Sequence, residues 1–113
     1  MKTPIFNKDS YPTEETLKEI REWKEPFTKG TAEDLLEFCM DAWEKTFGDI
    51  GYIVCGLDSS GSDYEFTTGG WSGNEDVINA MQENRLFWSL CWQESKRGGY
   101  HRFFTGGLLE EPF

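Results

Sequence analysis

Apolar residues in the first half of the chain recur at the spacing of an α-helix. Over residues 31–47 they occupy positions 32, 35, 36, 39, 40, 43 and 47, the pattern of a helix that packs against a core. Thr31 can cap this helix and Gly48 can end it in a left-handed conformation. A shorter helix is predicted after Thr13, which can act as its N-cap, and Pro26 ends it.

From residue 51 onward the apolar period becomes two, which indicates strands. Residues 52–57 and 63–68 are predicted strands, joined by a turn over 58–63. If Asp58 and Asp63 close that turn, one face of the hairpin carries Ile53, Cys55, Leu57, Tyr64 and Phe66.

A third helix and a second hairpin follow. Ser72 and Glu75 have the spacing of a capping box, which predicts a helix over 73–84. Residues 86–95 are a predicted strand, and the pair Gly98-Gly99 turns it into a strand over 100–105.

The predicted order is ααββαββ, an α+β two-layer domain with a four-stranded, mostly antiparallel sheet and helices on one face. We expect one domain over 1–113, with an irregular lead-in over 1–10 and a short tail over 106–113. The expected core between the second helix and the sheet contains Trp43, Phe66, Trp88 and Trp92. The other sheet face is unusually apolar, which favours a homodimer or a cover from the chain's own ends: it carries Tyr52, Val54, Phe87, Cys91 and Phe104.

The chain is strongly acidic. Its 113 residues include 11 Lys and Arg against 21 Asp and Glu, a net charge of −10. The excess is uneven, because residues 85–105 carry a net charge of +3. Such a chain is repelled by nucleic acid and by anionic membranes, and it is attracted to basic protein surfaces.

Several classes of protein are excluded by composition. The apolar runs are too short for a membrane span or a signal peptide. The three cysteines are far apart and outside any CxxC spacing, so they are expected to be free thiols in a reducing cytoplasm. His101 is the single histidine, so zinc sites with two imidazoles are excluded, and we expect neither a metal nor a cofactor.

Two glycine motifs are candidates for ligand binding. The turn over 67–75 could direct backbone N–H groups at an anion, and the basic hairpin over 96–102 could contact phosphate. A purely structural interpretation is favoured for the turn, because Glu75 and Asp76 stand where a phosphate would bind. The ligand-loop candidates are Gly69, Gly70, Trp71, Ser72, Asn74, Arg97, His101 and Arg102.

Catalytic motifs are weak. Cys91 and His101 could form a nucleophile and base, but strand alternation places them on opposite faces of the sheet. The acidic turn over 58–63 lacks the glutamate that ends an EF-hand loop, so a calcium site is not favoured. No catalytic residue is predicted.

The acidic face of the first two helices is the remaining candidate site. Nine carboxylates occupy its polar positions: Glu14, Glu15, Glu19, Glu22, Glu33, Asp34, Glu37, Asp41 and Glu44. Such a face solubilises a protein, and it also suits rapid docking on a basic protein partner. The partner-binding candidates are Glu37, Asp41, Glu44, Tyr52 and Phe104.

The segment Thr68-Gly-Gly-Trp-Ser-Gly-Asn-Glu75, with Arg97-Gly-Gly-Tyr100, resembles a set of small uncharacterised proteins carried by bacteriophages and prophages. The resemblance covers about residues 50–105. It implies a phage or prophage context in the cytoplasm of a bacterial host, and it brings no site residues.

We therefore expect a non-enzymatic protein that binds and modulates or inhibits a host or defence factor, or acts as a toxin-immunity protein. The alternative is a small-molecule or nucleotide-binding domain that uses the 68–75 loop and the 97–102 hairpin.

Overall fold

The computed structural model describes residues 3–23, 29–44, 46, 50–55 and 61–106. Its elements, in chain order, are α1 (Glu14–Arg21), α2 (Lys29–Asp41), β1 (Ile50–Cys55), β2 (Gly61–Thr67), α3 (Ser72–Glu83), α4 (Arg85–Cys91), β3 (Trp92–Lys96) and β4 (Tyr100–Phe104). The predicted α+β class is confirmed. Three residues that the sequence assigns to helix ends and a turn lie outside the described residues: Pro26, Gly48 and Asp58.

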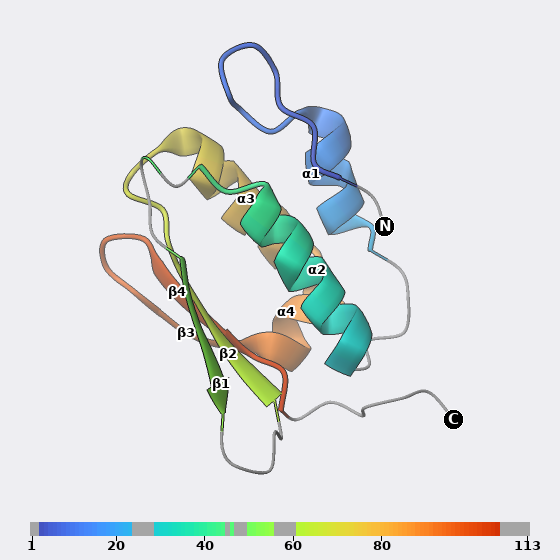
Figure 1. Ribbon diagram of the computed structural model, residues 1–113, viewed down its shortest axis with the longest axis vertical. Coiled ribbons are helices and arrows are strands. Elements are labelled where there is room, and N and C mark those ends of the chain that lie inside the picture. Colours follow the sequence, from blue (N-terminus) through green and yellow to red (C-terminus); the bar gives the residue numbers. More distant parts are fainter. Residues whose placement is uncertain (1–2, 24–28, 45, 47–49, 56–60, 107–113) are drawn as a thin grey trace.

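The strands form an antiparallel sheet in which β4 lies between β2 and β3. β1 pairs with the other side of β2, so the strand order is β1-β2-β4-β3. The helices lie on one side of this sheet (Figure 1). Tyr64, Phe66 and Phe103 are buried in the core that the two layers enclose.

The segment before α1, which was predicted to be an irregular lead-in, forms a closed loop on α1. Phe6 and Pro12 form a β-bridge, and the N–H of Thr13 donates to the Ile5 carbonyl at 2.9 Å. Thr16 Oγ1 accepts from the Ile5 N–H at 2.8 Å and donates to the Ile5 carbonyl at 3.0 Å. Thr13 caps α1 as predicted, because its Oγ1 accepts from the Thr16 N–H at 3.3 Å.

α2 differs from its predicted bounds at both ends. It begins at Lys29, so the predicted cap Thr31 lies inside the helix, and it ends at Asp41, well before the predicted end. The early end has a tertiary cause. The Glu44 N–H donates to Asn74 Oδ1 at 2.9 Å, and this bond replaces one that a continued helix would make.

The register of the first hairpin also differs from the prediction. A turn over 58–63 would place Leu57 opposite Tyr64, whereas Tyr52 lies opposite Tyr64. Residues 56–60 lie outside the described residues. Because the first strand is apolar at consecutive positions, hydrophobic alternation alone could not choose between registers that differ by an odd number of residues.

The strand predicted over 86–95 is wrong in its first half. This half is the helix α4, which Asn84 caps by accepting from the Phe87 N–H at 3.3 Å, and β3 begins only at Trp92. Phe87 and Cys91 are one helical turn apart and both are buried. A short apolar run satisfies both periods, so its periodicity could not distinguish a strand from a helix.

This change alters the expected aromatic core. Trp43 and Phe66 are buried as predicted, and their rings meet edge to face at 5.0 Å. Trp88 is only partly buried; it packs on Phe103 at 5.4 Å and stacks on Trp92 at 5.7 Å. The prediction that Trp92 is buried is wrong, because it is 38% exposed at the start of the edge strand β3.

The prediction that the open face of the sheet is apolar is also partly wrong. Phe87 and Cys91 belong to α4 and lie in the core instead. The side chains of Tyr52 and Val54 lie outside the described part of the structure. Phe104 is then the one member of the expected patch whose side chain the structure describes on a strand. The apolar surface that favoured a homodimer is therefore reduced to this residue among the described side chains.

Two adjacent phenylalanines of β4 test the assignment of the two sheet faces. Phe103 is fully buried and Phe104 is half-buried on the opposite face. We expect Phe103→Ala to lower the free energy of unfolding by about 3–5 kcal/mol, through lost burial and the cavity it leaves. Phe104→Ala should cost less than about half of that. Urea unfolding of both variants measures the difference, and equal losses would contradict the assignment.

Candidate functional site

The structure brings the two glycine motifs together. Gly69 and Gly70 have φ values of 65° and 77°, and Gly98 and Gly99 have φ values of 89° and 80°, which favour glycine. The Thr68 N–H donates to the Gly99 carbonyl at 3.1 Å. A Cβ atom on Gly99 would collide with the Thr68 side chain. The two turns thus lie side by side at one end of the sheet (Figure 1).

The first glycine turn uses its amides internally. The Gly70 N–H donates to Thr68 Oγ1 and the Trp71 N–H to the Thr68 carbonyl, each at 3.3 Å. The N–H groups of Asn74 and Glu75 both donate to the Trp71 carbonyl at 3.1 Å. Four of the amides that an anion could recruit are therefore bonded within the turn itself.

The predicted capping box is wrong, because α3 begins one residue earlier than expected. Trp71 is its N-cap and makes no side-chain capping bond. Ser72 Oγ instead bonds the Tyr11 hydroxyl at 2.8 Å, and the Tyr11 and Trp71 rings lie 4.8 Å apart. The Trp71 ring also covers Gly73, where a Cβ atom would collide with it. Trp71 and Ser72 thus anchor the N-terminal loop on α3.

Asn74 is a structural residue rather than an exposed ligand contact. It is fully buried, and its Nδ2 donates to the carbonyls of Glu44 at 3.1 Å and Thr68 at 3.2 Å. Its Oδ1 accepts from the Glu44 N–H at 2.9 Å. A single side-chain amide therefore joins α3 to the turn just before it and to the segment after α2, which is 30 residues away in sequence.

The basic residues of the second motif do not converge on one point. Arg97 is exposed near the hairpin turn, whereas Arg102 lies on the open face of the sheet. His101 and Arg102 are neighbours on β4, so their side chains project to opposite faces. The structure therefore separates the cations that would have to bind one phosphate.

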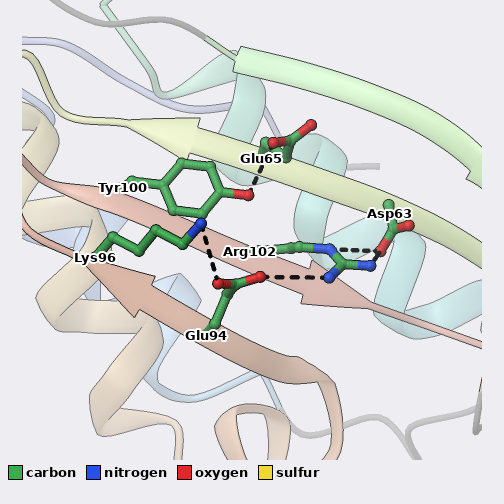
Figure 2. Close-up of polar contacts among 6 residues, drawn as sticks. All are labelled: Asp63, Glu65, Glu94, Lys96, Tyr100 and Arg102. Atoms are coloured by element: carbon green, nitrogen blue, oxygen red, sulfur yellow. Dashed lines mark hydrogen bonds and ion pairs between the residues drawn. The ribbon is translucent and has the colours of Figure 1, made fainter.

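The open sheet face holds an internal charge network (Figure 2). Arg102 donates to Asp63 Oδ1 through Nε at 3.0 Å and Nη2 at 2.9 Å, and its Nη1 lies 3.4 Å from Glu94 Oε2. Lys96 Nζ lies 3.6 Å from Glu94 and 5.4 Å from the centre of the Tyr100 ring. Arg102 is thus engaged by carboxylates of the same chain.

Tyr100 belongs to the same network, and its hydroxyl donates to Glu65 Oε1 at 2.8 Å. Burial, followed by this hydrogen bond and the Glu65 charge, raises the pKa of Tyr100 to about 12. The hydrogen bond to Asp63 raises the pKa of Arg102. Both residues therefore keep their neutral-pH protonation states, so neither is suited to proton transfer near pH 7.

His101 faces a serine that the sequence did not single out. Its Nδ1 lies 2.7 Å from Ser95 Oγ, and Ser95 Oγ also accepts from Trp92 Nε1 at 2.8 Å. Ser95 and His101 are opposite each other in the β3–β4 hairpin. The two-residue turn predicted from the sequence would not have paired them. Burial lowers the pKa of His101. Among the described residues, no carboxylate bonds the other ring nitrogen of His101, as a catalytic base would require. The contacts from His101 through Ser95 to Trp92 therefore position the Trp92 ring, and they do not activate Ser95.

Cys91 is not a partner for His101. It is fully buried in α4, and burial raises the pKa of its thiol to about 12, which disfavours the reactive thiolate. The sequence analysis also excluded a Cys–His pair, but it did so by placing Cys91 on a strand, whereas Cys91 is the last residue of α4.

The predicted partner-binding residues are divided between two layers. Glu37 and Asp41 are exposed on α2. Glu44 has a local role, because its Oε1 accepts from the Thr46 N–H at 2.9 Å, and this bond lowers the pKa of its carboxyl group. Phe104 lies on the open face of the sheet, with its ring where a side chain on Gly106 would project. Glu37 and Asp41 therefore remain as the acidic docking candidates.

A surface cavity of about 230 Å³ lies between the N-terminal loop and α1, and Phe38 of α2 also lines it. Two carboxylates of α1 and two apolar side chains contribute to its lining, which consists of Thr3, Ile5, Glu15, Thr16, Glu19 and Phe38. The sequence placed both glutamates on a helix face but gave no sign of the cavity. The N-terminal loop, which carries Ile5 across α1, creates it.

No protein-family model matches the chain, and no curated protein or solved structure shows significant similarity to it. The resemblance to phage proteins therefore stays a prediction. Among the described residues, no helix is long and apolar enough to cross a membrane. Within the same ranges, no three histidines, cysteines or carboxylates are grouped as metal ligands.

Two asparagines of α3 test the structural role of the glycine turn. Asn74→Ala removes the three hydrogen bonds of a fully buried side chain and deprives the Glu44 N–H and carbonyl of these partners. We expect it to lower the free energy of unfolding by about 2–3 kcal/mol. Asn79→Ala, at an exposed position of the same helix, should change it by less than about 0.5 kcal/mol. If the stability of the Asn74→Ala variant were unchanged, the structural role of Asn74 would be contradicted, and Asn74 would again be a candidate for ligand binding.

Alkaline titration tests the network on the open face. Because the pKa of Tyr100 is raised from 10.0 to about 12, folding favours the neutral phenol. Its contribution to stability is complete below about pH 10 and is lost as the pH rises toward 12. Ultraviolet absorbance should show a late phenolate that Tyr100→Phe removes and that Glu65→Gln shifts to lower pH. A titration unchanged by both substitutions would contradict the described contact.

Proposed function

We propose that this chain is a non-enzymatic protein that binds and modulates or inhibits another protein through an acidic helical surface. That surface consists of Glu15 and Glu19 on α1 and Glu37 and Asp41 on α2. The observation that carries the proposal is the cavity beside α1, which combines the carboxylates of Glu15 and Glu19 with the apolar side chains of Ile5 and Phe38. Because the sequence resembles small phage and prophage proteins, the proposed partner is a host or defence factor.

The charge distribution supports a basic partner. The positive charges of β3 and β4 are largely engaged by Asp63 and Glu94 on the open sheet face. The carboxylates of Glu37 and Asp41, by contrast, are exposed on α2. A surface of this kind accelerates encounter with a positively charged protein and repels nucleic acid.

Exposed apolar side chains beside the cavity supply contacts that charge alone does not. Ile5 is 48% exposed and Phe6 is 41% exposed in the N-terminal loop, and Ile5 also lines the cavity. Protein interfaces combine an apolar centre with a polar rim. The alternative of a nucleotide-binding domain has less support, because the glycine turn uses its amides internally and Arg102 is paired.

Charge reversal with affinity capture tests the proposal. Tagged protein is incubated with bacterial host lysate, and captured proteins are quantified at increasing salt. Glu37→Lys with Asp41→Lys should reduce recovery of a specific partner by about tenfold or more, and it should flatten the salt dependence of recovery.

Glu75→Lys provides the matched control, because Glu75 is also an exposed glutamate on a helix but lies outside this surface. It should leave capture close to that of the unmodified chain. Equal capture by all variants, with thermal unfolding unchanged, would overturn the proposal.

A further inference from the structure

Two leucines of α4 form an exposed apolar pair. Leu86 is 59% exposed and Leu90 is 41% exposed. They are four residues apart, so their side chains are neighbours on the surface of the helix. Phe87 and Cys91 direct another side of α4 into the core. Covering the leucine pair would stabilise the fold, because it removes apolar surface from water.

The charge around this leucine pair is positive, although the whole chain is acidic. α4 contains Arg85 and no acidic residue, and residues 85–105 together carry a net charge of +3. A segment that covers the pair is therefore favoured if it combines apolar side chains with carboxylates.

The segment that follows β4 in the sequence has this composition. Residues 107–113, which lie outside the described residues, read Gly-Leu-Leu-Glu-Glu-Pro-Phe. They supply three large apolar side chains and two carboxylates, and they contain no basic residue. Their net charge of −2 is thus opposite in sign to that of the region around α4.

The described chain also leads to the right place. Phe103 of β4 pairs with Trp92, which is the residue directly after α4. Thr105 is fully buried, and its hydroxyl donates to Glu33 Oε2 on α2 at 3.0 Å. The described residues after β4 therefore begin beside the C-terminal end of α4.

The lengths of the two segments agree. α4 has seven residues and is therefore about 10 Å long. Four extended residues beyond Gly106 span about 13 Å. A segment that runs from Gly106 back along α4 thus brings its leucines to the leucine pair and its glutamates to Arg85.

We propose that residues 107–113 cover the leucine pair of α4 and run in the opposite direction to the helix. In this arrangement Leu108 and Leu109 lie on the pair, and Glu110 lies near Arg85. The cover comes from the same chain and not from a second copy, because a tethered segment does not lose the translational and rotational freedom that association costs.

Methyl NOEs in the full chain test this placement, because they are observed only between methyl groups a few ångströms apart. With the leucine methyl groups labelled, we expect NOEs from Leu108 or Leu109 to the leucine pair. A mixture of differently labelled chains distinguishes contacts within one chain from contacts between two. NOEs that arise between chains, or no NOE from either tail leucine to the pair, would overturn the inference.

Thermal unfolding of full-length variants provides a second measurement. Leu90→Ser and Leu109→Ser should each lower the Tm by about 4 °C, because each weakens the cover. The double variant should lose little more than the larger single loss, since both substitutions act on one contact.

Phe6→Ser is the matched control, because Phe6 is also 41% exposed but lies in the N-terminal loop. Combined with Leu109→Ser, it should lower the Tm by the sum of the two single losses. An unchanged Tm for Leu109→Ser, or additive losses for Leu90→Ser with Leu109→Ser, would contradict the cover. Neither measurement involves a partner, so the result is independent of the proposed function.

Discussion

The packing of this protein depends on two buried side-chain amides at the two ends of α3. Asn74 bonds the segment after α2 and the turn before α3. Asn84 follows the last residue of α3; its Nδ2 donates to the Ile20 carbonyl at 3.0 Å and its Oδ1 caps α4. A buried amide is costly unless its donors and acceptor are all used. These bonds therefore fix where α3 lies relative to its neighbours.

The aromatic core depends on this placement. α4 can leave α3 directly because Asn84 ends one helix and caps the next. Phe87 then contacts Phe103 at 5.6 Å, and Phe103 contacts Phe66 at 5.8 Å. Phe66 in turn meets Trp43 after α2. A continuous row of rings thus links the last helix to the second, and aromatic pairs of this kind contribute beyond their buried area.

Charged side chains are paired on the sheet layer and more exposed on the helical layer, and this difference supports the proposed function. On the open sheet face, acids and bases from β2, β3 and β4 pair with one another (Figure 2). On the helical layer, Arg21 bridges α1 and α3, while Glu37 and Asp41 remain exposed. Among the described residues, the acids of the sheet face are therefore paired with bases, whereas Glu37 and Asp41 on α2 remain exposed.

The sequence determined the elements whose signals are local. Thr13 caps α1, and Gly98 and Gly99 supply the left-handed turn of the last hairpin, because each acts on its own neighbours in the chain. Glu37 and Asp41 were predicted to be exposed for the same reason, from their place on one helical face.

Tertiary structure decided whatever depends on partners distant in sequence. The end of α2, the helix α4 and the burial of Asn74 follow from bonds that join segments 30 to 64 residues apart. The cavity also required the loop that carries Ile5 across α1. Hydrophobic period cannot encode such contacts, because a short apolar run or a lone asparagine satisfies several local structures equally well.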